Sequence, residues 1–428
     1  MTRTSISPAS PISSVVRHSL LLAAFFIPFS TALTNFFVVV TLIGFIGMAV
    51  ASPGLLRPLR SAPAWLALAL LVLLLLGVTW SIAPPDDVHT ALRKYSKLLL
   101  LPVVICLCEH DTNLSRRALR WSLAGTAYLA FATYLTWLGW MPTSELGWWR
   151  VGAPDDPSVF RNHITTGILL SFAACVCFVA ATYRTELAPR IARIAGGIYF
   201  SVPIVLLGQG RTGYVTLFIG LIVLFLLRTR FTPVRALAGI GAIALMFVAF
   251  YQVVPNFKAR TDALIHEVST HEARSPNGLR MSFLQVGTGA VAAHPIIGLG
   301  TGSFSEAYAP TAQATWPPGS PMAVIRHQPH SEFLLIAVQL GLVGFVVYLA
   351  MLATVCKPAF ATRQFETDVL ALLGAIYIIS STFNSLLWDP TEGYWFLLLS
   401  GCLYTLCSRL GPVPAQAKVG TLPAAAHG

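Results

Sequence analysis

The sequence predicts an all-α polytopic membrane protein with about 12 transmembrane helices, each near the ~20 apolar residues that cross a bilayer. Of its 428 residues 55% are hydrophobic and only 11% are charged, whereas soluble domains carry roughly 25% charged residues. The mean hydropathy of +0.71 agrees. Too few charges are present to coat a globule of this size, so lipid must face much of the surface.

The apolar stretches divide the chain into four parts. Residues 1–254 hold the first nine predicted spans, 255–330 form a large outer loop with amphipathic helices, and 331–410 hold the last three spans. Residues 411–428, rich in Ala, Pro and Gly, are expected to be a disordered cytoplasmic tail. The predicted spans lie near residues 17–33, 34–52, 64–83, 98–109, 119–140, 163–183, 193–209, 212–228, 234–254, 331–355, 367–387 and 393–408.

Basic residues gather on one side of this predicted topology. With the N-terminus inside, the inner segments carry most of the Lys and Arg, among them Arg57, Arg116 and Arg228, whereas acids and bases nearly balance outside. This asymmetry follows the positive-inside rule and puts both termini in the cytoplasm. It also accounts for the net charge of +11 without nucleic acid, which we exclude as a partner.

The stretch Arg326-His327-Gln328-Pro329-His330-Ser331-Glu332 lies where the outer loop meets the tenth span. Pro329 disfavours helix before it, so His330 lies at the outer mouth of a helix. The positive end of the helix dipole favours a neutral imidazole that can accept a proton. Two other interpretations stay open: an interfacial or capping histidine, and a metal pair of His327 and His330 with Glu332 as third ligand.

Two arginines are candidates for binding phosphate. Arg211 lies in Gly208-Gln209-Gly210-Arg211-Thr212-Gly213 at the outer membrane boundary, and the glycines permit close approach of a bulky ligand. Arg280 opens a predicted amphipathic helix in the outer loop. A guanidinium binds a phosphate through two hydrogen bonds at once. Alternatively, Arg211 snorkels to the headgroups and Arg280 is an ordinary exposed arginine.

Other outer residues form a weaker set of candidates. Their alternatives are headgroup anchoring for the bases and a plain turn for the aspartate. We expect substrate contacts from Arg93, Lys94, Lys97, Arg161, His163, Arg326, His327 and Asp389. The segment 298–302, Gly-Leu-Gly-Thr-Gly, follows no predicted strand, so a dinucleotide-binding loop is excluded and a flexible turn is expected.

Several of these elements recur together in a known family. An arginine opens a loop helix at Arg280, a His-Pro-x-x-Gly-x-Gly turn covers 294–300, His-Ser-x-x-Leu covers 330–334 and Gly-x-x-Gly covers 341–344. With the glycine-flanked Arg211, they resemble the O-antigen ligase/polymerase family of membrane glycosyltransferases, and within it the O-antigen ligases. Ser331 departs from the asparagine common in the family.

The resemblance implies a bacterial inner-membrane enzyme of Gram-negative lipopolysaccharide assembly with a periplasmic active site. It implies transfer of a glycan from an undecaprenyl-diphosphate-linked O-antigen donor to the outer-core sugar of lipid A-core, without metal or cofactor. Arg211 and Arg280 would stabilise the leaving diphosphate and His330 would be the base. Alternatives are an O-antigen polymerase, a protein O-oligosaccharyltransferase or, from another class, a lipid-linked sugar flippase.

Overall fold

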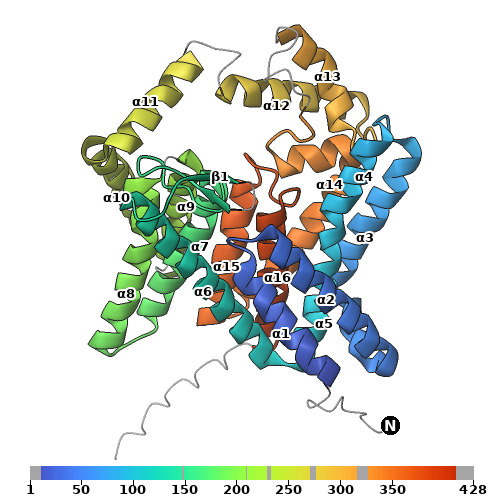
Figure 1. Ribbon diagram of the computed structural model, residues 1–428, viewed down its shortest axis with the longest axis horizontal. Helices are drawn as coiled ribbons and strands as arrows, with labels where there is room; N and C mark the ends of the chain where they lie inside the picture. The colour runs from blue at the N-terminus through green and yellow to red at the C-terminus, as the bar shows by residue number, and fades with distance from the viewer. Residues whose placement is uncertain are drawn as a thin grey trace, which may run out of the picture.

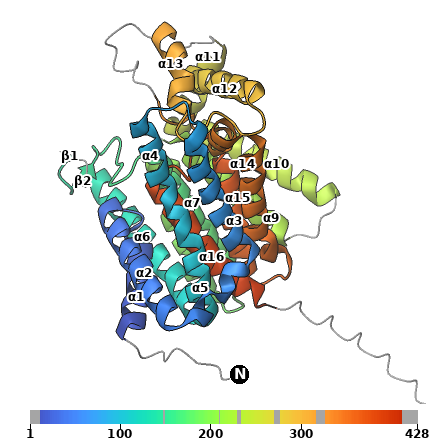
Figure 2. The same ribbon diagram turned by 90° about the vertical axis from the view of Figure 1, so that its right-hand side faces the viewer.

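The computed structural model describes residues 11–146, 149–208, 210–228, 233–269, 276–315 and 326–410. They form a bundle of long helices capped at one end by three shorter helices and a small hairpin (Figures 1 and 2). The predicted cytoplasmic tail, residues 411–428, lies outside the described residues. The fold class expected from composition is therefore present: an all-α architecture whose one small sheet is a two-stranded hairpin within the described residues.

The helices and strands follow one another along the chain as α1 (Pro11–Phe26), α2 (Thr31–Ala51), η1 (Pro53–Arg60), α3 (Ala62–Leu76), η2 (Gly77–Trp80), α4 (Pro85–Tyr95), η3 (Ser96–Leu99), α5 (Leu100–His110), α6 (Thr112–Trp137), β1 (Ser144–Leu146), β2 (Trp149–Val151), α7 (His163–Thr182), α8 (Leu187–Val202), the π-helical turn η4 (Pro203–Leu207), α9 (Arg211–Arg228), α10 (Pro233–Val253), α11 (Pro255–Ser269), α12 (Pro276–Ala293), α13 (Phe304–Thr315), α14 (Glu332–Cys356), η6 (Lys357–Phe360), α15 (Phe365–Ser380) and α16 (Pro390–Ser408). Strands β1 and β2 are antiparallel, with Ser144 opposite Val151.

Each predicted span overlaps at least one helix, and short polar residues cap several of these helices at their N-termini. Ser30, Asp111 and Asn162 cap α2, α6 and α7, accepting hydrogen bonds from backbone amides of the first turn. Six stretches of the described chain are long and apolar enough to cross a membrane: Thr31–Ala51, Ala62–Trp80, His163–Thr182, Leu187–Leu207, Arg211–Arg228 and Glu332–Phe360. The chain is thus a membrane-spanning protein, and the number of crossings stays a prediction.

Helix α10 departs from the arrangement expected of a ninth span. It is seen nearly end-on in Figure 1 and lengthwise in Figure 2, so it runs across the bundle rather than along it. It contacts mainly α9 and α11, and Leu237 and Leu245 are each 71% exposed. Because α10 has few packing partners, its direction cannot be predicted from the sequence alone.

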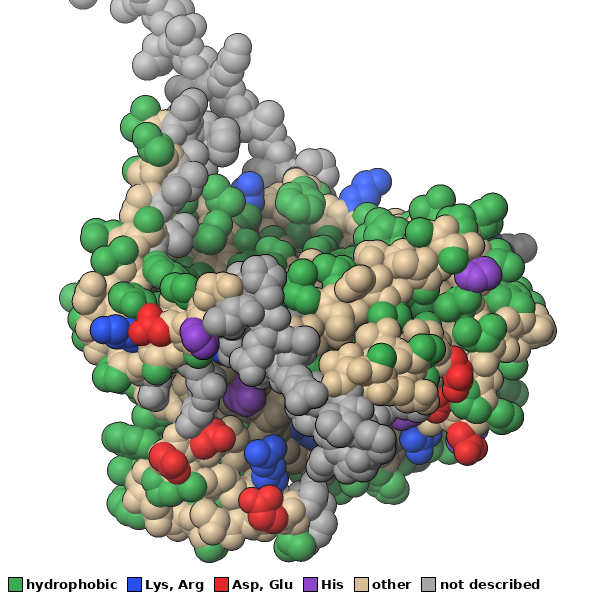
Figure 3. All heavy atoms as spheres, turned by 90° about the horizontal axis from the view of Figure 1, so that it is seen from above, with side chains coloured by type: hydrophobic (Ala, Val, Ile, Leu, Met, Phe, Trp, Pro, Cys, Tyr) green, Lys and Arg blue, Asp and Glu red, His purple; other side chains and the backbone are tan. Residues whose placement is uncertain are grey.

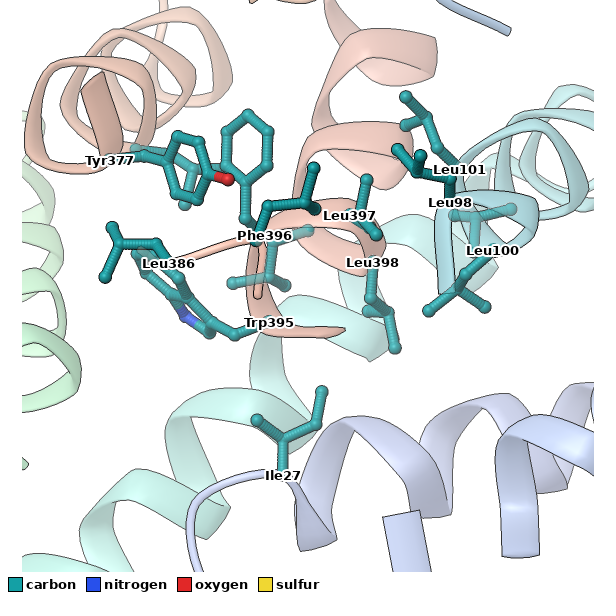
Figure 4. Packing of buried hydrophobic residues seen from close by; sticks show 14 of the residues in the cluster. Ile27, Leu98, Leu100, Leu101, Tyr377, Leu386, Trp395, Phe396, Leu397 and Leu398 are labelled. Carbon is teal, nitrogen blue, oxygen red and sulfur yellow. The ribbon is translucent and has the colours of Figure 1, made fainter. Parts of the chain in front are cut away.

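The core surrounds α16, which packs against α5, α6 and α15. Figure 4 shows Trp395 and Phe396 of α16 between Leu101 of α5 and Tyr377 of α15. The rings of Tyr377 and Phe396 stack 3.5 Å apart, and both side chains are fully buried. Because lipid tails are as apolar as these side chains, close packing rather than the hydrophobic effect holds such helices together. This packing fixes the start of α16, where Asp389 and Glu392 are located.

The two ends of the bundle differ in character. At one end, ion pairs join the helix termini: Arg17 to Asp111 at 3.5 Å, Arg409 to Glu109 at 2.9 Å and Arg228 to Asp368 at 2.5 Å. The described chain begins and ends there (Figure 1). Helices α11, α12 and α13 lie over the opposite end, within the predicted outer loop. All the candidate site residues belong to this second end, which we call the capped end.

Candidate active site

His330 occupies a strained position at the start of α14. Its backbone φ is +53°, and Phe160 is the other non-glycine residue with positive φ in the described chain. Such a conformation costs about 1–3 kcal/mol and is commonest at functional sites. The His330 amide donates to the Gln328 side chain at 3.2 Å. The next residue, Ser331, caps α14 by accepting from the Leu334 amide at 3.4 Å, a role that asparagine also performs well.

Helix α12 presents two side chains to His330. Arg280 and Phe283 are three residues apart and therefore share one helix face. The Phe283 ring lies 6.0 Å from the imidazole and packs on Tyr308 of α13 at 4.7 Å. Burial, then the charges of Arg280 and Arg326, lower the pKa of His330 to about 4. The imidazole is therefore neutral at physiological pH, as the sequence predicted, but the cause is burial and two guanidinium groups.

His327 is held by α4 rather than by its neighbours in sequence. Its Nδ1 lies 3.3 Å from an Asp87 carboxylate oxygen, and the other oxygen of Asp87 accepts a hydrogen bond from Ser305 of α13. Glu332, the proposed third metal ligand, points into the bundle instead. No group of three or more His, Cys, Asp and Glu side chains with metal-binding spacing occurs among the described residues.

The glycine-rich turn after α12 is packed, not flexible as expected from sequence. Its backbone inserts at a break in α14, where Gly341 has φ +60° and ψ −156°. The amides of Leu299 and Gly300 donate to Val338 and Gln339 carbonyls at 2.8 and 2.9 Å. A Cβ on Gly300 would lie 2.3 Å from the Ser81 Cα atom, so only glycine fits. The turn therefore fixes α12, with Arg280, relative to α14, with His330.

Arg211 lies at a different part of the capped end, at the first residue of α9. The preceding Gly210 packs on His163, at the first residue of α7: a Cβ there would approach the His163 carbonyl oxygen to 2.9 Å. One turn further in, Gly167 and Gly213 bring the α7 and α9 backbones together, as small residues do in membrane helix pairs. Two predicted residues, Arg211 and His163, are therefore neighbours.

The basic residues of α4 and η3 have different surroundings. Arg93 is exposed. The Lys94 ammonium lies 5.8 Å from the Trp388 ring centroid. Lys97 is 5% exposed, and its ammonium donates to the carbonyls of Trp388 and Asp389 at 3.2 and 2.8 Å. Asp389 itself is the residue before α16. Lys97 and Asp389 therefore join η3 to the start of α16.

Sequence reasoning missed the role of Glu332. Its carboxyl group is fully buried and accepts three hydrogen bonds: from the Tyr95 hydroxyl at 2.8 Å and from the Leu387 and Trp388 amides at 2.8 and 3.0 Å. These contacts tie the first residue of α14 to α4 and to the loop before α16. A glutamate next to a predicted apolar span was the available signal, because ionisable groups there are paired or functional.

A second buried glutamate links α16 to α7. Glu392, 2% exposed, accepts a hydrogen bond from Thr165. The Arg161 guanidinium binds the α1–α2 turn. It donates to the Ile27 and Pro28 carbonyls and, at 2.6 Å, to the Thr31 hydroxyl. Arg161 thus anchors the loop before α7.

Figure 3 shows the capped end from above. A histidine side chain lies in a hollow near the middle of this face, and Lys, Arg, Asp and Glu side chains are scattered around it out to the edge. Contacts and electrostatic interactions group the predicted residues in three sets: His330 with Arg280 and Arg326; Lys94 and Lys97 with the segment Trp388–Asp389; and Arg211 with His163. His327 pairs with Asp87 of α4.

Comparison with known families finds one match. Residues 196–349 match the family described as O-Antigen ligase. This segment of the chain is similar to the O-antigen ligase family. The match includes Arg211, Arg280, the 294–300 turn, His330 and the break of α14. No curated protein matches the chain. The family comprises glycosyltransferase-like ligases and polymerases, so the match supports an enzymatic role in general.

The matched segment does not extend to every element of the capped end. Lys97, Arg161, His163 and Asp389 lie outside residues 196–349. Their placement therefore comes from the structure alone.

Proposed function

We propose that this enzyme transfers a glycan from an undecaprenyl-diphosphate-linked O-antigen donor to a hydroxyl of the outer-core sugar of lipid A-core. The reaction would take place at the capped end, on the periplasmic side of the Gram-negative inner membrane. The match of residues 196–349 to the O-antigen ligase family supports the substrate class. The orientation is supported by the ion-paired opposite end, where basic residues gather as on a cytoplasmic face.

The observation that carries this proposal is the neutral His330 beside two guanidinium groups. In the proposed step the acceptor oxygen attacks the anomeric carbon of the donor, and its proton moves to the imidazole. The bond from that carbon to the diphosphate oxygen breaks, and undecaprenyl diphosphate leaves with the bonding electrons. Direct displacement inverts the anomeric configuration. Arg280 and Arg326 would stabilise the negative charge that develops on the diphosphate.

The same electrostatics would tune the base. An imidazole with a pKa of about 4 is a weak proton acceptor at neutral pH. A bound diphosphate, however, would offset the positive charges of Arg280 and Arg326 that disfavour the imidazolium. The pKa of His330 would then rise toward its ordinary value of about 6.5 when the donor is in place. His330 would become an effective base only in the donor complex.

Arg211 is assigned to the donor as well. It begins α9, so its backbone amides and guanidinium both offer positive charge at the capped end. Lys94 and Lys97 also lie at the capped end, but the Lys97 ammonium already donates hydrogen bonds to the Trp388 and Asp389 carbonyls. We assign Arg211 to the substrate because it begins α9 at the capped end, and Lys97 to the shape of the site because backbone carbonyls hold its ammonium.

Reconstitution distinguishes this proposal from the alternatives. Purified full-length protein in nanodiscs is supplied with lipid-linked glycan, with and without lipid A-core, and products are separated by gel electrophoresis. The proposal predicts glycosylated lipid A-core only when both substrates are present. Longer donor glycans without acceptor would indicate a polymerase, and glycosylated protein substrate a protein O-oligosaccharyltransferase. Movement of donor between the leaflets of proteoliposomes, without any transfer, would indicate a flippase.

A further inference from the structure

A pocket beside the start of α9 has no role in the steps above. It lies between the loop before α7, the first turns of α7 and α9, and the π-helical turn η4. Helical turns of the π type are rare in proteins, and many of those that occur are located at functional sites.

One buried hydroxyl in the pocket wall lacks a partner. Thr166 is 8% exposed, and its Oγ1 has no hydrogen-bond partner among the described residues. Nearly all buried polar groups are hydrogen-bonded, so such an exception calls for a ligand or water. Thr166 and His163 are three residues apart on α7 and both line the pocket, whereas Thr165 faces Glu392.

The charged side chains that line the pocket indicate which class of ligand it would bind. Among the lining residues, all of them described, Asp156 is the one Asp, Glu, Lys or Arg. Its carboxylate accepts from the Ser158 hydroxyl at 2.8 Å, which keeps it on the pocket wall. A carboxylate repels phosphate but accepts hydrogen bonds from hydroxyl groups. Pro157 and Pro203 supply apolar surface for the C–H face of a ring. A neutral, polyhydroxylated ring fits this combination.

The pocket adjoins Arg211, which the proposed function assigns to the donor. Gly210 is part of its wall, and the next residue is Arg211. We propose that this pocket is a subsite for one sugar unit of the lipid-linked donor glycan, bound by Asp156, Thr166 and His163. The inference rests on the proposed function, because that function supplies both the sugar and the diphosphate that brings it to Arg211.

Two variants of the full-length protein test the subsite. Thr166→Val removes a hydroxyl that has no hydrogen-bond partner among the described residues, so folding should be unharmed. Asp156→Asn removes the charge and keeps an acceptor for Ser158. Asp155→Asn is the matched control, since Asp155 is exposed and does not line the pocket. Unchanged thermal unfolding of each ligand-free variant verifies that it is folded.

The measurement is the affinity of nanodisc-embedded protein for two probes: undecaprenyl diphosphate without sugar, and the same lipid carrying the glycan. The wild type and Asp155→Asn should bind the glycan-bearing lipid more tightly. Thr166→Val and Asp156→Asn should each bind the glycan-bearing lipid about tenfold more weakly than the wild type does, because each loses about one good hydrogen bond. Their affinity for the sugar-free lipid should not change.

The possible results separate this inference from the proposed function. If both variants keep the full gain from the glycan while the wild type transfers it, the subsite is wrong and the ligase stands. If the gain is lost as expected but the wild type transfers to no acceptor, the subsite stands and the ligase is wrong. If the wild type gains no affinity from the glycan, the subsite is overturned.

Discussion

Replacing Glu332 by alanine should destabilise the protein strongly, whereas glutamine should be tolerated. The carboxyl group is fully buried and accepts from the Tyr95 hydroxyl and from two backbone amides, of Leu387 and Trp388. Alanine leaves all three donors buried without an acceptor, at about 1–3 kcal/mol each. Allowing for relaxation, we expect a loss of about 3–6 kcal/mol.

Glutamine preserves the hydrogen-bond pattern. Its carbonyl oxygen can accept from both amides, as one carboxyl oxygen of Glu332 does, and its NH₂ group can donate to the Tyr95 oxygen. What is lost is the charge assistance of the bonds, about 1–2 kcal/mol. Glu306→Ala is the control, because Glu306 is exposed on α13 and such surface changes stay within about 0.5 kcal/mol.

Thermal unfolding in nanodiscs measures the difference. At roughly 2 °C per kcal/mol for a large domain, Glu332→Ala should unfold about 6–12 °C below the wild type and Glu332→Gln about 2–4 °C below it. Transfer activity should fall in the same order, since Glu332 fixes the helix end that carries His330. If Glu332→Ala unfolds within 2 °C of the wild type, the hydrogen bonds do not contribute as argued.

Three further predictions concern the chemistry. Because the pKa of His330 is lowered to about 4, the imidazole stays neutral down to that pH; kcat/KM should decline only as pH falls through about 4, and kcat, which reports the donor complex, should decline at higher pH. An acid limb of kcat/KM near 6.5 would contradict this. Arg280→Ala should raise the KM for donor about 10–100-fold, with partial recovery in Arg280→Lys because bidentate geometry is lost; full recovery would indicate a simple point charge. Chelators should leave the rate unchanged, and inhibition reversed by zinc would restore the His327 and His330 metal site as a possibility.

Local patterns predicted most of the fold. Runs of about 20 apolar residues gave the long helices, since hydropathy over one span is a property of neighbouring residues. The direction of α10 could not be predicted, because it depends on packing against α9 and α11. The turn at 294–302 was read as flexible because its glycines suggest freedom; its order comes from Val338 and Gln339, which are distant in sequence.

The candidate site was predictable to a similar extent. Motif order brought attention to His330 and Arg280, and the structure brings them together. The partners of these residues were not predictable: Glu332 bonds to amides 55 and 56 residues away, and Asp87 reaches His327 from α4. Such pairings depend on how helices pack, which a single sequence does not report. Arg161, predicted as a substrate contact, donates hydrogen bonds to the α1–α2 turn, a pairing that the sequence did not indicate.

The central claim is that His330 removes the proton of the acceptor hydroxyl. Glycan transfer to lipid A-core is measured at saturating donor for the wild type, His330→Ala and the control His266→Ala, an exposed histidine on α11, with donor affinity determined on the same preparations. The account predicts a rate about 10²–10⁴-fold lower in His330→Ala alone, as expected for a lost general base, with donor affinity nearly unchanged. Transfer by His330→Ala at more than half the wild-type rate would contradict it.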